Sequence, residues 1–206
     1  MVGPNLWGHF KELLKKFSSV PKTQTNNMEK KVSIVVGHTK KKPGACGLGI
    51  ECEWEFNKKV AEHLKDICDI YYYDNYNSGY TAMVKRNATL MNMKNYTLNI
   101  ELHYNYANFL ANGCETLYYF PNMKGKQLAQ EFSKLISKTF RVKNRGVKAL
   151  ANENDRGFAA VYYPRATTLL VEPFFGSSPE DVARFYGKEK EYADTIRKFL
   201  KDRYYV

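Results

Sequence analysis

The sequence predicts an α/β fold in which a largely parallel, mixed central sheet of about six strands carries helices on both faces. Two observations lead to this prediction. Short apolar runs alternate along the chain with longer stretches whose apolar residues recur at helical spacing. The first run, residues 32–36 (VSIVV), is continuously apolar and β-branched apart from one serine, as is typical of a strand buried on both faces of a parallel sheet.

The remaining elements follow in the same alternation. A helical stripe covers residues 56–67 after a glycine-rich loop. Further strands are predicted at 69–73, 98–103, 116–120, 158–163 and 168–174, and further helices at about 81–93, 126–138 and 179–202.

The first 31 residues differ in character from the rest of the chain. Residues 6–20 place apolar side chains at helical spacing with lysines largely opposite, which predicts a basic amphipathic helix. Residues 21–31 (PKTQTNNMEKK) are typical of a linker. We therefore expect a helix and linker over 1–31 and a single globular domain over 32–206. The helix could either lie on an anionic membrane or wall polymer through residues 1–20, or pack on its own domain.

The charge balance narrows the class of partner. The chain has 32 Lys+Arg against 21 Asp+Glu, a formal net charge of +11, which favours polyanions such as nucleic acid, anionic membrane or acidic wall polymers. One hypothesis is therefore a non-enzymatic basic binding protein, which predicts a clustered basic face and no metal. Glu and Lys are interleaved over 179–202, as on an ordinary solvated surface, so no nucleic acid partner is expected.

Cysteine spacing and hydropathy give three negative expectations. The 4 cysteines lack the spacing of a cysteine zinc site and suggest no disulfide framework, so mostly buried thiols are expected among Cys46, Cys52, Cys68 and Cys114. No apolar run approaches the roughly 18 residues needed to span a bilayer. The N-terminus also lacks the pattern of a signal peptide, which predicts synthesis in the cytoplasm.

Candidate catalytic residues stand where the predicted strands end. His38, His103 and Glu172 each lie at the carboxyl end of a strand, and Glu53 opens the helix after the glycine-rich loop. Open α/β sheets gather their catalytic groups at this edge. Hydrolytic zinc sites take three ligands from His and Asp/Glu, with a further carboxylate as general base. For either histidine alone, a loop role is as plausible as a ligand role, and His63 fits a helix edge better than a metal site.

Several motifs occur in an order that is informative. Gly37-His38-Thr39 is followed by Pro43-Gly44-Ala45, by Glu53 before Asn57, by Glu101-Leu-His103-Tyr-Asn105 and by Leu169-Leu-Val-Glu172-Pro-Phe-Phe. From about residue 32 to residue 203, this order and spacing resemble the zinc N-acetylmuramoyl-L-alanine amidases of the amidase-3 family. Residues 113–120 (GCETLYYF) and 145–148 (RGVK) resemble further segments of that family.

Carried over by position, the resemblance implies a role for each residue. His38, Glu53 and His103 would hold Zn²⁺, and Glu172 would be the catalytic carboxylate. Asn105 matches a family asparagine and is expected to orient the site or to bind substrate.

Two features depart from this pattern or leave alternatives open. Thr39 and the lysines at 40–42 stand where the family often has a second glycine, which affects loop shape and substrate contacts. Glu51 and Glu55 flank Glu53 and are the alternative ligands.

The implied reaction is hydrolysis of the amide bond between N-acetylmuramic acid and L-alanine in the peptidoglycan stem peptide. A small basic chain of this kind resembles a phage endolysin, made in an infected host and acting at the cell wall in bacteriolysis. The nearest alternative is another zinc amidohydrolase or a carboxypeptidase, which would yield a different product.

Overall fold

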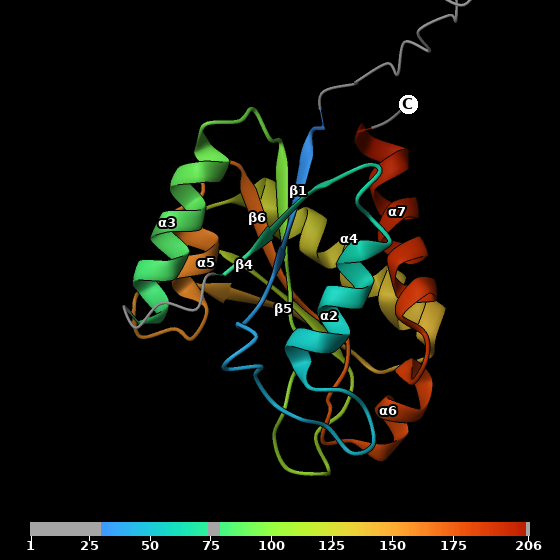
Figure 1. The fold of residues 1–206 in the computed structure, drawn as a ribbon. Coiled ribbons are helices and arrows are strands. Elements are labelled where there is room, and N and C mark those ends of the chain that lie inside the picture. The colour runs from blue at the N-terminus through green and yellow to red at the C-terminus, as the bar shows by residue number, and fades with distance from the viewer. Residues whose placement is uncertain (1–29, 74–78, 205–206) are drawn as a thin grey trace, which may run out of the picture.

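The computed structural model describes residues 30–73 and 79–204. It confirms the predicted α/β fold, with a six-stranded mixed sheet in the order β2-β1-β3-β6-β4-β5 and helices on both faces (Figure 1). The strands are β1 (Val32–Val36), β2 (Asp69–Tyr72), β3 (Leu98–Leu102), β4 (Cys114–Tyr119), β5 (Asn144–Leu150) and β6 (Thr167–Glu172). The helices are α2 (Glu53–Glu62), α3 (Tyr80–Asn92), α4 (Met123–Phe140), α5 (Phe158–Tyr162), α6 (Pro179–Phe185) and α7 (Glu189–Tyr204).

The centre of the sheet is parallel. β1 pairs with β2 and β3, and β3 pairs with β6, all in parallel register. β4 reverses direction against β6 and then pairs in parallel with β5. All residues of β1 and β3 are buried, as expected for strands covered by helices on both faces.

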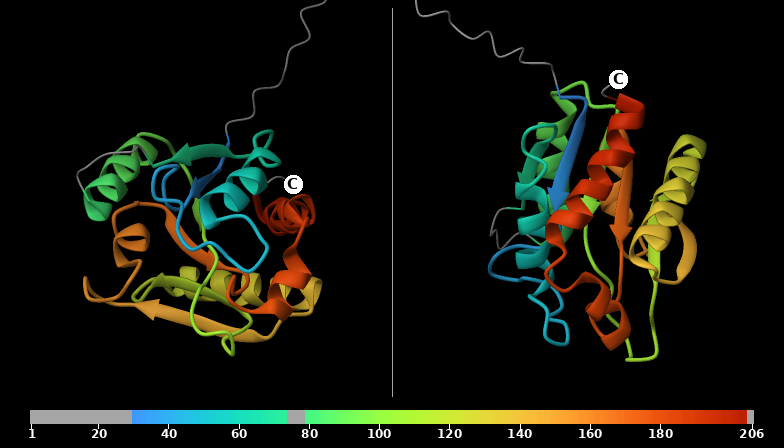
Figure 2. Two further views of the ribbon diagram at one scale, coloured as in Figure 1. Left: turned by 60° about the horizontal axis from the view of Figure 1, so that its bottom comes forward. Right: turned by 90° about the vertical axis from the view of Figure 1, so that its right-hand side faces the viewer.

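Alternate residues of β1 separate the two sides of the core. Ile34 packs in a cluster with Phe56 of α2 and Phe132 of α4, whereas Val35 packs with Val84 of α3. Helices α2, α4 and α7 therefore cover one face, and α3 and α5 cover the other, as Figure 1 and the side view in Figure 2 show. Among the described residues, no helix is both long enough and apolar enough to cross a membrane.

Three sequence predictions of secondary structure were wrong. Residues 158–163 form helix α5 rather than a strand, because a short apolar run has no periodicity that separates the two states. The sixth strand is instead β5, an edge strand whose exposed and basic residues hide its pairing with β4. The predicted helix over 179–202 is two helices, α6 and α7, separated at Gly187, where φ is +66°.

The cysteine prediction was half right. Cys68 and Cys114 are buried thiols, and burial raises the pKa of each to about 12. Cys46 and Cys52 instead form a disulfide with a sequence separation of 6. So short a loop gives no framework pattern in the sequence, and the turn that brings the two cysteines together includes Gly49 at a φ of +73°.

Most of the predicted N-terminal unit, including the amphipathic helix over 6–20, lies outside the described residues. Residues 30 and 31 lead directly into β1.

Candidate metal centre and active site

The residues singled out from the sequence meet at one edge of the sheet. His38 is the second residue after β1, His103 is the first residue after β3, and Glu172 is the last residue of β6. Because these three strands are parallel neighbours, their carboxyl ends and the loops after them gather at the lower edge in Figure 1. Glu53, the first residue of α2, reaches the same edge from the loop after β1.

Two histidines and one glutamate form a compact group there. Ligand atoms of His38, Glu53 and His103 all lie within 4.8 Å of one another. The two oxygens of Glu53 divide between the rings: Oε1 is 2.7 Å from Nδ1 of His103, and Oε2 is 3.0 Å from Nε2 of His38. Glu53 is only 3% exposed, so this is a built site rather than a surface cluster of acidic groups. These donors suit a divalent metal ion.

The backbone around the group is adapted to close approach. His38 has φ of +64°, a left-handed conformation that is uncommon for a residue with a side chain. A Cβ at Gly44 would lie 2.6 Å from Oε2 of Glu53, and a Cβ at Gly37 would lie 2.5 Å from Nε2 of His103. Both glycines therefore leave the space that the candidate ligands occupy.

The electrostatics of the group follow from burial and mutual contact. Burial opposes ionisation of Glu53, but hydrogen bonds with His103 and His38 lower the pKa of its carboxyl to about 2. Burial likewise opposes protonation of His103, but hydrogen bonds with Glu101 and Glu53 raise its pKa to about 10. Glu53 is therefore ionised and His103 carries the neighbouring positive charge. A metal cation at this place would supply the same positive charge beside the Glu53 carboxylate.

The hydroxyl of Tyr104 contacts the backbone of the loop before α2 at three points. The Tyr104 hydroxyl lies 2.6 Å from the carbonyl oxygen of Ala45 and 2.9 Å from that of Glu51, and it accepts a hydrogen bond from the backbone N–H of Gly47 at 3.2 Å. The Cys46–Cys52 disulfide closes the same loop directly before Glu53. The sequence had not indicated either tie.

Of the three neighbouring glutamates, only Glu53 belongs to the group. Glu51 is exposed and forms an ion pair with Lys59, and neither Glu51 nor Glu55 lies in the cluster of candidate ligands. Among the described residues, the alternative ligands suggested by the sequence are therefore not supported by the geometry.

Glu172 faces a second carboxylate that sequence reasoning had given no role. In the antiparallel register of β4 and β6, Glu115 stands opposite Glu172, so the two side chains share one face of the sheet. Burial raises the pKa of Glu172 to about 7; the charge of His103 acts against this shift, and those of Glu115 and Glu53 act with it. Glu172 can thus exchange a proton near neutral pH.

Asn105 and Arg145 hold Glu115 in place. Nδ2 of Asn105 donates to Oε1 of Glu115 at 2.7 Å, and Nε of Arg145 donates to Oε2 at 3.1 Å. Asn105 also accepts a hydrogen bond from the backbone N–H of Tyr106 through its side-chain oxygen. Asn105, predicted to orient the site or bind substrate, therefore contacts Glu115 rather than the candidate ligands.

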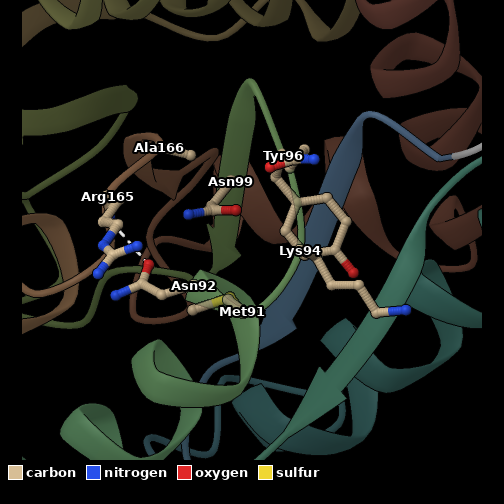
Figure 3. A pocket seen from close by; sticks show the side chains of 8 residues that line it. Met91, Asn92, Lys94, Tyr96, Asn99, Arg165 and Ala166 are labelled. Carbon is tan, nitrogen blue, oxygen red and sulfur yellow. Dashed lines mark hydrogen bonds between the residues drawn. The ribbon is translucent and has the colours of Figure 1, made fainter.

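Other residues noted in the sequence lie away from the group. His63 ends α2 and is exposed, in agreement with a helix-edge role. A polar hollow of about 180 Å³ lies at the opposite edge of the sheet, between the end of α3 and the starts of β3 and β6 (Figure 3). Arg165 and Asn92, which line it, are joined by a hydrogen bond from the Arg165 backbone N–H to Oδ1 of Asn92. None of the predicted site residues lines this hollow.

Comparison with known protein families shows which family this chain belongs to. Residues 32–202 match the family Amidase_3, described as N-acetylmuramoyl-L-alanine amidase. The chain belongs to the N-acetylmuramoyl-L-alanine amidase family. It is therefore an enzyme, a peptidoglycan hydrolase that cleaves the amide bond between N-acetylmuramic acid and L-alanine, and the alternative of a non-enzymatic binding protein is wrong.

Several solved structures have the same fold as this chain. The catalytic domain of the CD27L endolysin targeting Clostridia difficile is 24% identical with a TM-score of 0.68, and the match covers 83% of this chain and 96% of that one. The amidase from Clostridium difficile 630 is 18% identical with a TM-score of 0.66, covering 83% and 95%. The amidase AmiC2 of Nostoc punctiforme is 22% identical with a TM-score of 0.64, covering 84% and 96%. No curated protein matches the chain significantly.

Proposed function

We propose that the enzyme hydrolyses the amide bond of its peptidoglycan substrate with a Zn²⁺ ion held by His38, Glu53 and His103, and with Glu172 as the general base. The observation that carries this proposal is the convergence of the three ligand side chains within 4.8 Å at the carboxyl edge of the sheet. Two imidazoles and one carboxylate bind zinc firmly while leaving it net positive.

The chain's own residues divide the chemistry. When bound, zinc would supply a Lewis acid that polarises the scissile carbonyl and activates water. Glu172 takes a proton from the attacking water and passes a proton to the leaving amine of L-alanine. A pKa near 7 suits this double task, because the carboxyl group then accepts and releases protons at similar cost. Asn105 has an orienting role, since it fixes Glu115 opposite Glu172.

The biological setting is proposed from the chain's charge and from its structural neighbour. CD27L is an endolysin, and we extend that role to this chain as a phage enzyme of cell wall degradation and bacteriolysis. The formal net charge of +11 favours adsorption to an anionic wall.

The role of the N-terminal segment is a separate proposal. Residues 1–20 would contact anionic membrane or wall polymer, and the catalytic domain would begin at residue 32. A chain lacking residues 1–20 should bind anionic vesicles more weakly than the full chain in a co-sedimentation assay. Equal binding by the two chains would rule out the membrane role of this segment.

The deciding experiment identifies the new amino terminus released from purified peptidoglycan. We expect free L-alanine amino termini that disappear with a chelator and return when Zn²⁺ is added back. Reducing sugar ends, or cleavage within the peptide, would overturn the bond assignment. The variant Glu172→Ala should bind Zn²⁺ as the wild type does while losing turnover; wild-type turnover would remove Glu172 from the mechanism.

A further inference from the structure

A buried carboxylate lies behind the candidate ligands. Glu101 belongs to β3, two residues before His103, and is only 2% exposed. A strand at the centre of a sheet is an unfavourable place for a charge, because removing a carboxylate from water costs several kcal/mol unless a partner compensates it. Glu101 therefore needs a specific partner at this position.

Both oxygens of Glu101 have a partner. Oε1 lies 2.9 Å from Nε2 of His103, and Oε2 accepts a hydrogen bond from the Tyr73 hydroxyl at 2.9 Å. Tyr73 follows β2 and is itself buried. A short chain of contacts thus runs from Tyr73 through Glu101 to the imidazole of His103.

The two nitrogens of His103 face different surroundings. Nδ1 lies 2.7 Å from Glu53, on the side of the other candidate ligands. Nε2 faces inward, towards Glu101 and against Gly37, where even a Cβ would come within 2.5 Å of it. Nδ1 is the nitrogen available to a metal ion, and Nε2 is left to donate its proton to Glu101.

We propose that Glu101 is a positioning residue for the metal centre: it accepts a hydrogen bond from the Nε2–H of His103, so that, when the metal binds, Nδ1 presents its lone pair beside Glu53 and His38. This inference rests on the proposed metal function. A carboxylate behind a ligating histidine fixes the tautomer and the ring orientation, and it strengthens the imidazole as a ligand. Tyr73 in turn fixes the carboxylate, because its hydroxyl donates to the oxygen that His103 does not use.

Metal affinity and tautomer test this role independently of activity. Zn²⁺ affinity would be measured by competition with a chromophoric chelator for the wild type, Glu101→Gln and Tyr73→Phe. Glu101→Gln keeps the shape of the side chain and removes its charge. Tyr71→Phe is the matched control, since Tyr71 lies in β2 close to Tyr73 but its hydroxyl pairs with that of Tyr96. Long-range ¹⁵N NMR of the zinc-loaded wild type would show which nitrogen of His103 carries the proton.

The expected result is a loss of about 10- to 100-fold in Zn²⁺ affinity for Glu101→Gln, a smaller loss for Tyr73→Phe and none for Tyr71→Phe. The proton should be on Nε2. Unchanged affinity in Glu101→Gln, or a metal on Nε2, would overturn the positioning role while leaving the proposed function intact. Failure of the wild type to bind Zn²⁺ would overturn both, so the two failures are distinguishable. Circular dichroism melting of each variant separates a lost fold from a lost ligand.

Discussion

At the scale of single residues, Gly37 limits how the candidate ligands can pack. A Cβ at this position would lie 2.5 Å from Nε2 of His103 and 2.6 Å from the carbonyl oxygen of Leu102, and it would also overlap Cε1 of the ring. The imidazole would have to move, and the Leu102 carbonyl, which accepts a hydrogen bond from the Gly37 N–H, would also have to shift. We expect Gly37→Ala to weaken Zn²⁺ binding at least tenfold by misplacing a ligand.

Chelator competition would measure this loss, and thermal unfolding would separate a misplaced ligand from a weakened sheet. Gly125→Ala provides the control, because Gly125 lies in the first turn of α4, and the atoms nearest to its added Cβ belong to the Asn122 side chain. Wild-type affinity in Gly37→Ala would mean that His103 has more freedom than the structure shows.

The pairing of Glu115 with Glu172 gives a prediction about pH dependence. Glu172 must be ionised to accept a proton, so kcat/KM should fall as the pH drops below its pKa of about 7. The charge of Glu115 contributes to that raised value, after burial. Glu115→Gln removes the charge, lowers the pKa of Glu172 and should move the acid limb of the pH profile to lower pH.

The measurement is kcat/KM against pH for the wild type, Glu115→Gln and the exposed control Glu153→Gln. The acid limb should move in the first variant only. An unmoved limb in Glu115→Gln would assign it to a group other than Glu172.

The sequence singled out candidate residues at the ends of strands and at the start of α2, and it gave no role to charged residues within strands. His38 and His103 could be brought together in advance because parallel strands gather their carboxyl ends at one edge, whereas the choice of these two and Glu53 as ligands came from the family resemblance. Glu101 and Glu115 were not given roles, because their partners come from other strands and depend on register. A signal was present nonetheless: a charged residue within a predicted buried strand, as in Leu98–Leu102, requires a buried partner.

At the scale of elements, the alternation of strands and helices predicted the class of fold but not every member of the sheet. The strand count agreed with the prediction only because α5 was taken for a strand and β5 was overlooked. β5 lies at the edge, where few of its side chains enter the core, so apolar periodicity carries little information. The position of β6 between β3 and β4 is a property of register and pairing that no local pattern encodes.

The loop before α2 is the element whose rigidity should matter most to the metal centre. The Cys46–Cys52 disulfide closes it directly before Glu53. Closure of so short a loop contributes about 2 kcal/mol in the chain-entropy model, so replacing both cysteines by serine should lower the free energy of unfolding by about that amount. Zn²⁺ affinity should fall as well, because Glu53 begins the helix that the loop positions.

Urea unfolding and chelator competition would test both effects, and dithiothreitol should reproduce them in the wild type. The double variant Cys68→Ser/Cys114→Ser would be a poor control, since both thiols are buried in the core. The serine variant of Cys46 and Cys52 treated with dithiothreitol serves better, because it should not respond. A response there would point to an effect of the reductant on the metal.

At the scale of the whole molecule, the active site is expected to reduce the stability of the fold. The folded state raises the pKa of Glu172 from 4.5 to about 7, chiefly through burial. Between these two values the folded chain binds more protons than the unfolded chain. Its stability therefore falls as the pH rises from about 4.5 to 7, and the full cost is present above pH 7.

Glu172→Gln abolishes this cost together with the proposed general base. The free energy of unfolding of the variant minus that of the wild type should increase by about 1–3 kcal/mol from pH 5 to pH 8. Urea denaturation with a chelator present would measure it at both pH values. Glu153→Gln, at an exposed position, should show no such pH-dependent gain. An equal difference between wild type and Glu172→Gln at both pH values would mean that burial of Glu172 does not penalise its ionised form. A gain confined to high pH, in a variant without turnover, would show that this enzyme keeps a destabilising carboxylate at its centre because catalysis requires it.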